Sequence, residues 1–478
     1  MLTPLDDYLI HQTPETLDRV ATSDRNFYDR YYFNCHDLAG ETFLVIAMGV
    51  YPNLGVMDAF ATCVQRNERQ FVVRASRELE ADRSWTTVGP IGVEVVEGLR
   101  LFHVWCDENE YGLSFDLTFQ GVAPPFQEPH FFRRAGPRVM MDYTRLTQPG
   151  RWHGSLKVGG EEHDIRASNW WGARDHSWGI RPIERAAGGA PVKDAPRGFF
   201  WAWAPIQFDD HAIMFTASED HDGSSWHKAA AWLHVYDSGL AEEPLSVVRH
   251  DLRLKPGTRT FDGGQVVLTE QNGQEVTLDF QPLSLLHMAG AGYAYQGGMW
   301  RHGEHHGPLA VEGETWDLKD EALVRRLAGQ SETVCRVRKG EQIGYGAFEF
   351  LLLGLYEPYG FTSPADVAPI EEPVAAEPHV DEPTADLAPG GTEAARQIEG
   401  APAATGSNGE SPSVAPRAID EAPTPGEPLP QELRAEEPPV EEPERVVDEP
   451  VLEPERPMSR AERLLRARRE IEQREGTR

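Results

Sequence analysis

Residues 169–182 form the densest group of side chains that could do chemistry. An Asp-His dipeptide, Asp175-His176, lies directly after Arg174 and a few residues before Arg181. Five tryptophans lie in this segment or on the apolar segment that follows: Trp170, Trp171, Trp178, Trp201 and Trp203. A carboxylate and an imidazole held among indole rings can have shifted pKa values, which general acid or base catalysis near neutral pH requires. One hypothesis is that Asp175 is a catalytic acid or base, His176 its partner, and Arg174 or Arg181 an electrostatic orienter.

The same residues allow a structural interpretation. Asp175 could form a buried ion pair with Arg174 or Arg181 that locks a crossover between two sheets, with the tryptophans as core. Residue types alone leave both interpretations open.

A second cluster occupies residues 302–306, where His302, His305 and His306 accompany Glu304. Imidazoles and carboxylates are competent metal ligands. Adjacent residues of an extended segment point to opposite faces, however, so at most two or three of these side chains could converge. The sequence therefore predicts a solvent-exposed loop here and no metal site.

Motifs for cofactors are missing from the sequence. It contains no Walker loop and no strand-linked G-x-G-x-x-G for nucleotides or dinucleotides, so we expect no cofactor, and it contains no G-x-S-x-G, which argues against a serine hydrolase. The four cysteines, Cys35, Cys63, Cys106 and Cys335, are widely dispersed, which fits a reducing compartment.

Short strands must position the candidate residues. Leu113–Gln120 alternates apolar and polar residues without a break, which is typical of a half-buried antiparallel strand. Comparable runs occur at 42–51, 70–76, 99–105, 211–217, 230–236, 275–280 and 344–353. This spacing is that of a meander and favours barrels or sandwiches over a parallel α/β fold.

Turn and cap signals refine this pattern. Asn272-Gly273 and Gly159-Gly160 each separate two strand-like runs and predict tight hairpins. Residues 318–328 predict one short helix, with Asp317 as its N-cap and Gly329 at its end.

The composition changes near Phe361, the last aromatic residue of the chain. Residues 361–455 contain 18 prolines and 23 acidic residues against 4 arginines, so they cannot bury enough apolar surface to offset chain entropy. We expect a disordered acidic Pro/Glu-rich tail there. Residues 456–478 read as a basic amphipathic helix with a capping box, which is either solvated or a docking element for a protein partner.

Charge and hydropathy exclude several classes of partner. The formal charge is −32 for the chain and −17 for residues 1–360, with no basic stretch in that part, which argues against nucleic acid or an anionic membrane surface. The amino terminus lacks the basic and apolar regions of a signal peptide, and no run reaches the length of a membrane span. We expect a cytoplasmic protein without a transmembrane segment.

The run GARDHSWGIRP at 172–182, followed by Trp201-Ala202-Trp203, resembles the hallmark of the carotenoid 1,2-hydratase and AttH-like superfamily. The stretch MMDYTRLTQPGRWHGSLKVGG at 140–160 and the closing GYGAFEFLLLGLYEPYGF at 344–361 are also similar to that family. The resemblance spans roughly residues 25–356. It implies an all-β fold of two consecutive lipocalin-like antiparallel β-barrel domains with the Asp-His segment near their junction.

The expected organisation is therefore an N-terminal extension at 1–24, barrels at 25–190 and 191–360, the tail at 361–455 and the helix at 456–478. Family activities include hydration of carotenoid ends, cyclisation of natural products and lipid-linked roles. The residues expected to bind a ligand are Tyr143, Trp171, Trp178, Arg181, Trp201 and Trp203.

Three functions remain open from the sequence. The first is an enzyme that hydrates, isomerises or cyclises an apolar terpenoid-, steroid- or polyketide-like molecule in a barrel cavity without a cofactor. The second is a noncatalytic carrier of a lipophilic ligand. The third is an interaction protein whose tail recruits partners. A buried Asp175 with a shifted pKa that lines a cavity would favour the first.

Overall fold

The computed structural model describes residues 1–182, 195–293, 298 and 300–370. Within these ranges nearly all regular structure is β-strand, arranged as two antiparallel sheets that belong to one compact unit. The predicted all-β fold with two consecutive lipocalin-like barrels is confirmed. The tail from residue 371 onward, the basic helix at 456–478 and the domain boundary predicted near residue 190 lie outside the described residues.

The first sheet follows the chain from residue 27 to residue 180 and takes one later strand. Its strands within the described chain are β1 (Phe27–Asp37), β2 (Thr42–Tyr51), β3 (Val56–Gln65), β4 (Arg69–Glu78), β5 (Thr87–Val88), β6 (Ile91–Glu97), β7 (Leu101–Cys106), β8 (Leu113–Gly121), β9 (Phe126–Gln127), β10 (Phe131–Ala135), β11 (Arg138–Val158), β12 (Glu161–Ile165), β13 (Trp170–Ile180) and β20 (Leu309–Asp317). They pair in the order β20-β4-β3-β2-β1-β13-β11-β8-β7-β6-β5, while β9, β10 and β12 pair with the long β11. Gly89, next to β5, lies against Val311 of β20 and Ala75 of β4, so the sheet curls into a nearly closed barrel.

The second sheet is a closed barrel. Its strands, in the order in which they pair, are β14 (Gly198–Gln207), β15 (His211–Glu219), β16 (Ser225–His234), β17 (Glu243–Leu254), β18 (Phe261–Thr269), β19 (Glu275–His287), β21 (Ser331–Lys339) and β22 (Gln342–Gly354). The hairpin predicted at Asn272-Gly273 joins β18 to β19, and Gly273 has the positive φ of +87° that such a turn requires. The hairpin predicted at Gly159-Gly160 joins β11 to β12.

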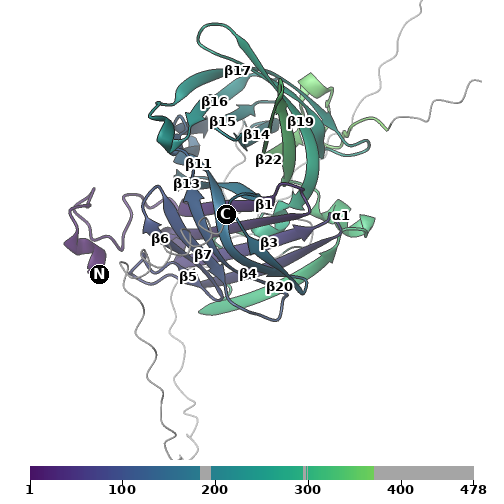
Figure 1. Cartoon of the computed structure of the whole chain (residues 1–478). Helices are drawn as coiled ribbons and strands as arrows, with labels where there is room; N and C mark the ends of the chain where they lie inside the picture. Colours follow the sequence, from purple (N-terminus) through teal and green to yellow (C-terminus); the bar gives the residue numbers. More distant parts are fainter. Residues whose placement is uncertain (183–194, 294–297, 299, 371–478) are drawn as a thin grey trace, which may run out of the picture. The chain divides into compact units, whose positions relative to one another are not determined.

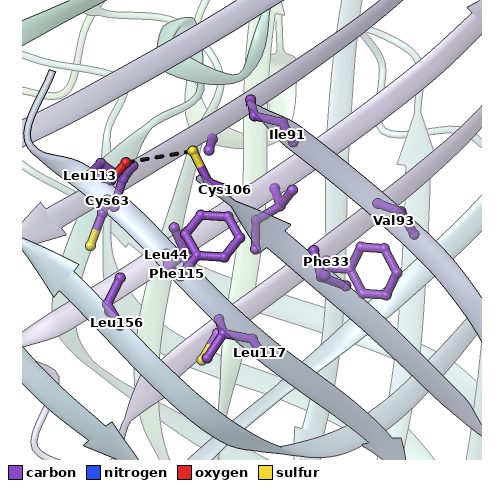
Figure 2. Close-up of a cluster of buried hydrophobic side chains, with 14 of the residues drawn as sticks. Phe33, Leu44, Cys63, Ile91, Val93, Cys106, Leu113, Phe115, Leu117 and Leu156 are labelled. Atoms are coloured by element: carbon purple, nitrogen blue, oxygen red, sulfur yellow. Dashed lines mark hydrogen bonds between the residues drawn. The ribbon is translucent and has the colours of Figure 1, made fainter. Parts of the chain in front are cut away.

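Side chains fill the inside of each barrel. In the first, Phe33 contacts Phe119 and Trp152 edge to face. The predicted alternation of β8 places Leu113, Phe115, Leu117 and Phe119 in this core. Figure 2 shows Phe33 together with the first three of these β8 side chains. The Cys106 thiol lies in the same core and points to the carbonyl of Leu113. In the second barrel, phenylalanines dominate the core: Phe200, Phe215, Phe261, Phe280, Phe348 and Phe350.

A third buried cluster lies between the two sheets. Tyr28, Tyr32 and Phe43 of the first sheet meet Trp201 and Trp203 of the second barrel there. Successive side chains of a strand point to opposite faces. On β14, Ala202 therefore points into the second barrel, while its neighbours Trp201 and Trp203 point away from it into the cluster between the sheets.

Strand β20 crosses from the second half of the chain to the first sheet, where it pairs with β4 (Figure 1). The sequence analysis did not predict this strand, because its outward residues are largely exposed and show no clean apolar alternation. The helix after it, α1 (Glu321–Leu327), is shorter than predicted. Leu318, the first residue of the predicted helix, lies before it, and its N–H donates to the Glu68 carbonyl. The carboxylate of Asp320, not that of Asp317, caps the helix.

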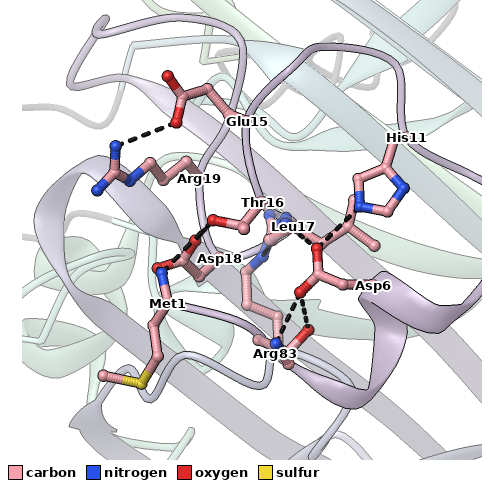
Figure 3. A network of polar contacts seen from close by, with 10 residues as sticks. Met1, Asp6, His11, Glu15, Thr16, Leu17, Asp18, Arg19 and Arg83 are labelled. Carbon is pink, nitrogen blue, oxygen red and sulfur yellow. Dashed lines mark hydrogen bonds and ion pairs between the residues drawn. The ribbon is translucent and has the colours of Figure 1, made fainter.

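Short 3-10 turns connect several elements: η1 (Pro4–Asp7), η2 (Pro52–Leu54), η3 (Tyr236–Ser238), η4 (Met288–Ala291) and η5 (Glu357–Tyr359). The N-terminal segment before β1 is held by its own polar network, in which the Met1 amine pairs with Asp18 and the Asp6 carboxylate accepts from His11 and the Leu17 N–H (Figure 3). Arg83 ties this segment to the first sheet by donating to the Leu17 carbonyl.

The folded chain continues beyond residue 360, where the tail was predicted to begin. Phe361 is buried and Arg259 donates to the carbonyls of Ser363 and Asp366. The Gly257 N–H also donates to the Ala368 carbonyl. Residues 361–370 therefore contact the second barrel, and the predicted start of the tail at residue 361 is too early.

Candidate functional site

A cavity of about 280 Å³ lies between the two sheets and not inside either barrel core. Strands β1, β11 and β13 supply one wall, and β14, β16, β21 and β22 supply the other. Tyr293, Arg301 and His302, which follow η4 in the chain, line a third side. This volume is near the lower end of those that accept small organic ligands.

Asp175 lies on β13, and the alternation of side chains along this strand points its carboxyl into the cavity. It lies opposite Tyr32 of β1 and Thr147 of β11. Its side chain is buried, and within the described chain its Oδ1 atom has no hydrogen-bond partner. Burial raises the pKa of Asp175 and outweighs the opposite effect of the arginine charges on Arg145, Arg30 and Arg181. The carboxyl is therefore able to keep a proton at higher pH than an exposed aspartate.

The buried ion pair of this region is Arg145–Glu128. Arg145 donates from Nε and Nη2 to the two carboxylate oxygens of Glu128, each at 2.7 Å. Thr147 and Trp203 also donate to Glu128. Burial alone would raise the pKa of Glu128, but the Arg145 charge, the nearby His227 imidazole and the hydrogen bonds from Arg145 and Thr147 lower it to about 2. Arg145 thus has its own counterion.

The described residues contain no salt bridge between Asp175 and either Arg174 or Arg181. Arg174 donates to Gln148 at 2.8 Å and lies over the Phe102 ring, on the other face of β13. Arg181 lines the cavity and lies over the rings of Tyr28 and Tyr143. The structural ion pair predicted for Asp175 is therefore not present in this form.

Strand parity also separates Asp175 from His176, the predicted partner. The His176 Nε2 atom pairs with Asp29 at 2.7 Å, and both residues line a different hollow under the N-terminal segment. Adjacent residues of a strand point to opposite faces. His176 is therefore not placed to exchange a proton with Asp175.

The predicted ligand-binding residues divide in the same way. Tyr143, Arg181 and Trp201 line the cavity with Asp175. Trp203 is buried just behind it on Glu128. Trp171 is buried elsewhere, where its indole donates to the Ala167 carbonyl and contacts Tyr345, and Trp178 is 38% exposed beside His176.

Two cavity carboxyls were missed by the sequence analysis. Glu332 of β21 and Glu349 of β22 are buried on the wall opposite Asp175. Tyr32 donates to Glu332, and Gln330 donates to Glu349. A signal for them exists, because Glu349 interrupts the apolar run Ala347–Leu353 and an unexplained acid in a buried strand indicates a polar site.

The cluster at 302–306 was predicted to be an exposed loop, and for His302 this is wrong. His302 is buried in the cavity wall, where its Nε2 atom is 2.7 Å from the Ala291 carbonyl and its Nδ1 atom is 2.9 Å from Arg30. His305 is exposed as predicted. Across the described chain, no group of three or more His, Cys, Asp or Glu side chains is arranged to hold a metal ion.

The fold and site define a class of protein, a two-barrel β protein with a largely apolar cavity between its sheets that contains the buried carboxyls of Asp175, Glu332 and Glu349. A search of curated proteins gave no match. The profile of a family of unknown function, DUF8625, matches residues 2–362, and the chain belongs to this family. None of the helices in the described residues is long and apolar enough to span a membrane.

Solved structures with a similar fold include an AttH candidate from Nitrosomonas europaea, with 14% identity and a TM-score of 0.43 over 73% of this chain and 99% of that chain. CghA shows 11% identity and a TM-score of 0.39 over 69% of this chain and 89% of its own. Kievitone hydratase from Nectria haematococca shows 12% identity and a TM-score of 0.32 over 67% and 88%. Similarities at this level carry no argument about function.

Proposed function

We propose that this protein is a cofactor-independent enzyme that transfers a proton to an apolar small molecule in the cavity, with Asp175 as the acid. The observation that carries the proposal is the Asp175 carboxyl, which is buried, raised in pKa and without a partner on Oδ1 in the described structure, on the wall of a cavity lined largely by apolar groups. A structural aspartate would have its buried oxygens hydrogen-bonded. A catalytic acid needs them free for the substrate.

The proton transfer balances without a cofactor. The O–H bond of protonated Asp175 breaks as a C–H bond forms at a substrate double bond, and the neighbouring carbon becomes cationic. Water can then add to that carbon, a neighbouring carbon can lose a proton, or an internal double bond can attack it. These outcomes are hydration, isomerisation and cyclisation. The added water loses one of its protons, and the new cation formed in cyclisation loses a proton from a neighbouring carbon, so each outcome returns one proton to the protein for Asp175.

The aromatic walls support such a cation. Trp201, Tyr143 and Trp226 line the cavity, and aromatic faces attract positive charge. Their apolar surface would also exclude bulk water from the reacting carbon. Terpenoid-, steroid- or polyketide-like molecules have the double bonds and apolar bodies that this cavity requires.

We also infer that the chain is a member of the carotenoid 1,2-hydratase and AttH-like superfamily. The Asp-His-Ser-Trp-Gly run at 175–179 and the two consecutive barrels support this assignment. Arg174 and His176 are bonded to other residues in this structure, so they can influence Asp175 only indirectly.

A two-stage experiment tests the function. Native mass spectrometry of the purified protein first identifies a molecule retained in the cavity, and related polyenes are then incubated with the protein in D₂O. The enzyme incorporates deuterium at carbon, Asp175→Asn lowers the rate at least about a hundredfold, and Asp29→Asn keeps it. Ligand binding without deuterium incorporation by the native chain would instead identify a carrier.

A further inference from the structure

We propose that the ligand of this cavity carries an anionic group, such as a carboxylate, and that Arg30 binds it. This inference deepens the proposed function and rests on it, since it names the substrate class. An apolar body would lie along the aromatic wall, and the anionic group would lie at the Arg30 end.

Arg30 is a buried cation that lacks an anionic partner within the described chain. Its side chain comes from β1, is only 4% exposed and lines the cavity. Nη1 lies 2.9 Å from His302 Nδ1, Nη2 donates to the Tyr293 hydroxyl at 2.8 Å, and Nε has no partner. A buried guanidinium is normally paired with a carboxylate, because burying an isolated charge costs several kcal/mol or more.

The His302 ring that contacts Arg30 is neutral. The His302 Nε2 atom lies 2.7 Å from the Ala291 carbonyl, which can only accept a hydrogen bond, so Nε2 carries the hydrogen. Nδ1 is then the acceptor for Arg30. Burial, followed by the charges of Arg30 and Arg181, lowers the pKa of His302 well below its usual value, in agreement with a neutral ring.

Other acids near Arg30 do not take the place of a counterion. The charges of Asp175 and Arg30 act on each other across the cavity, but no described hydrogen bond or salt bridge joins these two side chains. Glu128 is engaged with Arg145. Glu332 accepts from Tyr32 and Glu349 from Gln330, and no described contact joins either of them to Arg30. Asp58 does not line the cavity; it accepts from the Gly303 N–H at 2.6 Å, and burial raises its pKa to about 7.

The rest of the cavity fits the apolar part of such a ligand. Trp201, Met141 and Leu351 lie on its walls. An anion on Arg30 would also neutralise one of the positive charges that oppose the protonated form of Asp175. Binding of the substrate would then favour the acid form that the proposed reaction needs.

A pair of fluorescent probes tests this inference, since 8-anilino-1-naphthalenesulfonate and N-phenyl-1-naphthylamine differ only by the sulfonate. The native chain should bind the sulfonate at least about tenfold more tightly, which is the scale of one hydrogen bond to a charged group. Arg30→Gln should remove this preference and leave binding of the neutral probe within about twofold. Arg325→Gln, on the exposed face of α1, is the matched control and should keep the preference.

Arg30→Lys retains the charge and should retain part of the preference. Competition needs no variant: decanoate should displace the neutral probe from the native chain at least about tenfold better than decanol does. Equal binding of the two probes, equal competition by acid and alcohol, or an unchanged preference in a folded Arg30→Gln protein would each overturn the inference. Deuterium incorporation into a neutral substrate is measured independently of probe binding. Incorporation without a preference for anionic probes would overturn this inference and leave the proposed function intact.

Discussion

Glu332 on β21 and Glu349 on β22 are directly opposite each other in an antiparallel pair and are buried on the same wall of the cavity. Burial raises the pKa of both carboxyls, and the neighbouring Glu349 raises that of Glu332 further. Two carboxylates this close in an apolar setting resist being ionised together. The pair therefore holds a proton where two exposed glutamates would have lost theirs.

Replacing Glu349 by Gln should stabilise the protein at high pH. Folding raises the pKa of Glu349 above its unfolded value of 4.5. Such a carboxyl adds to the free energy of unfolding at pH values below 4.5, and this contribution is lost as the pH rises through the pKa of the folded state. Glu349→Gln should therefore raise the free energy of unfolding at pH 8 by about 1–3 kcal/mol, and the gain should shrink toward pH 5. Urea denaturation at the two pH values measures this, with the exposed Glu275→Gln as control. An equal gain at both pH values would contradict the explanation.

Replacing Asp175 by Asn should leave the fold stable. Asp175 forms no salt bridge in the described structure, so its replacement by Asn leaves no buried arginine without its only counterion. We expect the free energy of unfolding at pH 7 to fall by less than about 1 kcal/mol, in contrast to the 3–5 kcal/mol for a broken buried pair. Insolubility of the variant would restore the structural interpretation of Asp175.

Replacing Glu128 by Gln should be far more costly. The change leaves Arg145 buried without its counterion, so the free energy of unfolding should fall by about 3–5 kcal/mol. Glu161→Gln is the matched control, because it breaks the exposed pair with Arg66 and should cost at most about 1 kcal/mol. Comparable losses in the two variants would show that Arg145 finds another partner.

His176→Gln should have little effect on proton transfer. Its ring pairs with Asp29 away from the cavity, so deuterium incorporation should stay within about threefold of the native rate, while Asp175→Asn lowers it at least about a hundredfold. A hundredfold loss in both variants would show that the dipeptide acts as a unit after all.

Two truncations test the corrected end of the second barrel. A chain that ends at residue 360 loses buried Phe361 and the carbonyls that Arg259 bonds. It should melt several degrees below a chain that ends at residue 370, because a lost aromatic side chain and hydrogen bonds cost a few kcal/mol. Differential scanning calorimetry of the two chains makes the comparison.

The fold could be predicted because its strands carry their own signal. The alternation at Leu113–Gln120 and the turn at Asn272-Gly273 depend only on neighbouring residues, and both appear in the structure as expected. Strand β20 carries little such signal, since its place depends on the open edge of β4 more than two hundred residues earlier.

The candidate site could be predicted only in part, for the same reason. Asp175 could be recognised from the residues next to it in the chain. The alternation of side chains along β13 would also have shown that Asp175 and His176 point to opposite faces. Arg30, Glu332 and His302 come from three distant segments, and only tertiary structure brings them together. These residues indicate a site because they are polar and buried, and burial is a property of the folded chain.

The pairing of β20 with β4 has a consequence for the order in which the protein is made. Arg74 of β4 and Glu314 of β20 bond across 240 residues of chain, so the edge of β4 must wait for its partner to be synthesised. At the usual elongation rates of 5–20 residues per second, this wait is roughly 12–50 s. Throughout that time the nascent first barrel presents an unpaired edge strand, a surface that recruits other chains. The edge of β4 is therefore the part of the first barrel that stays open to pairing with other chains until β20 is made.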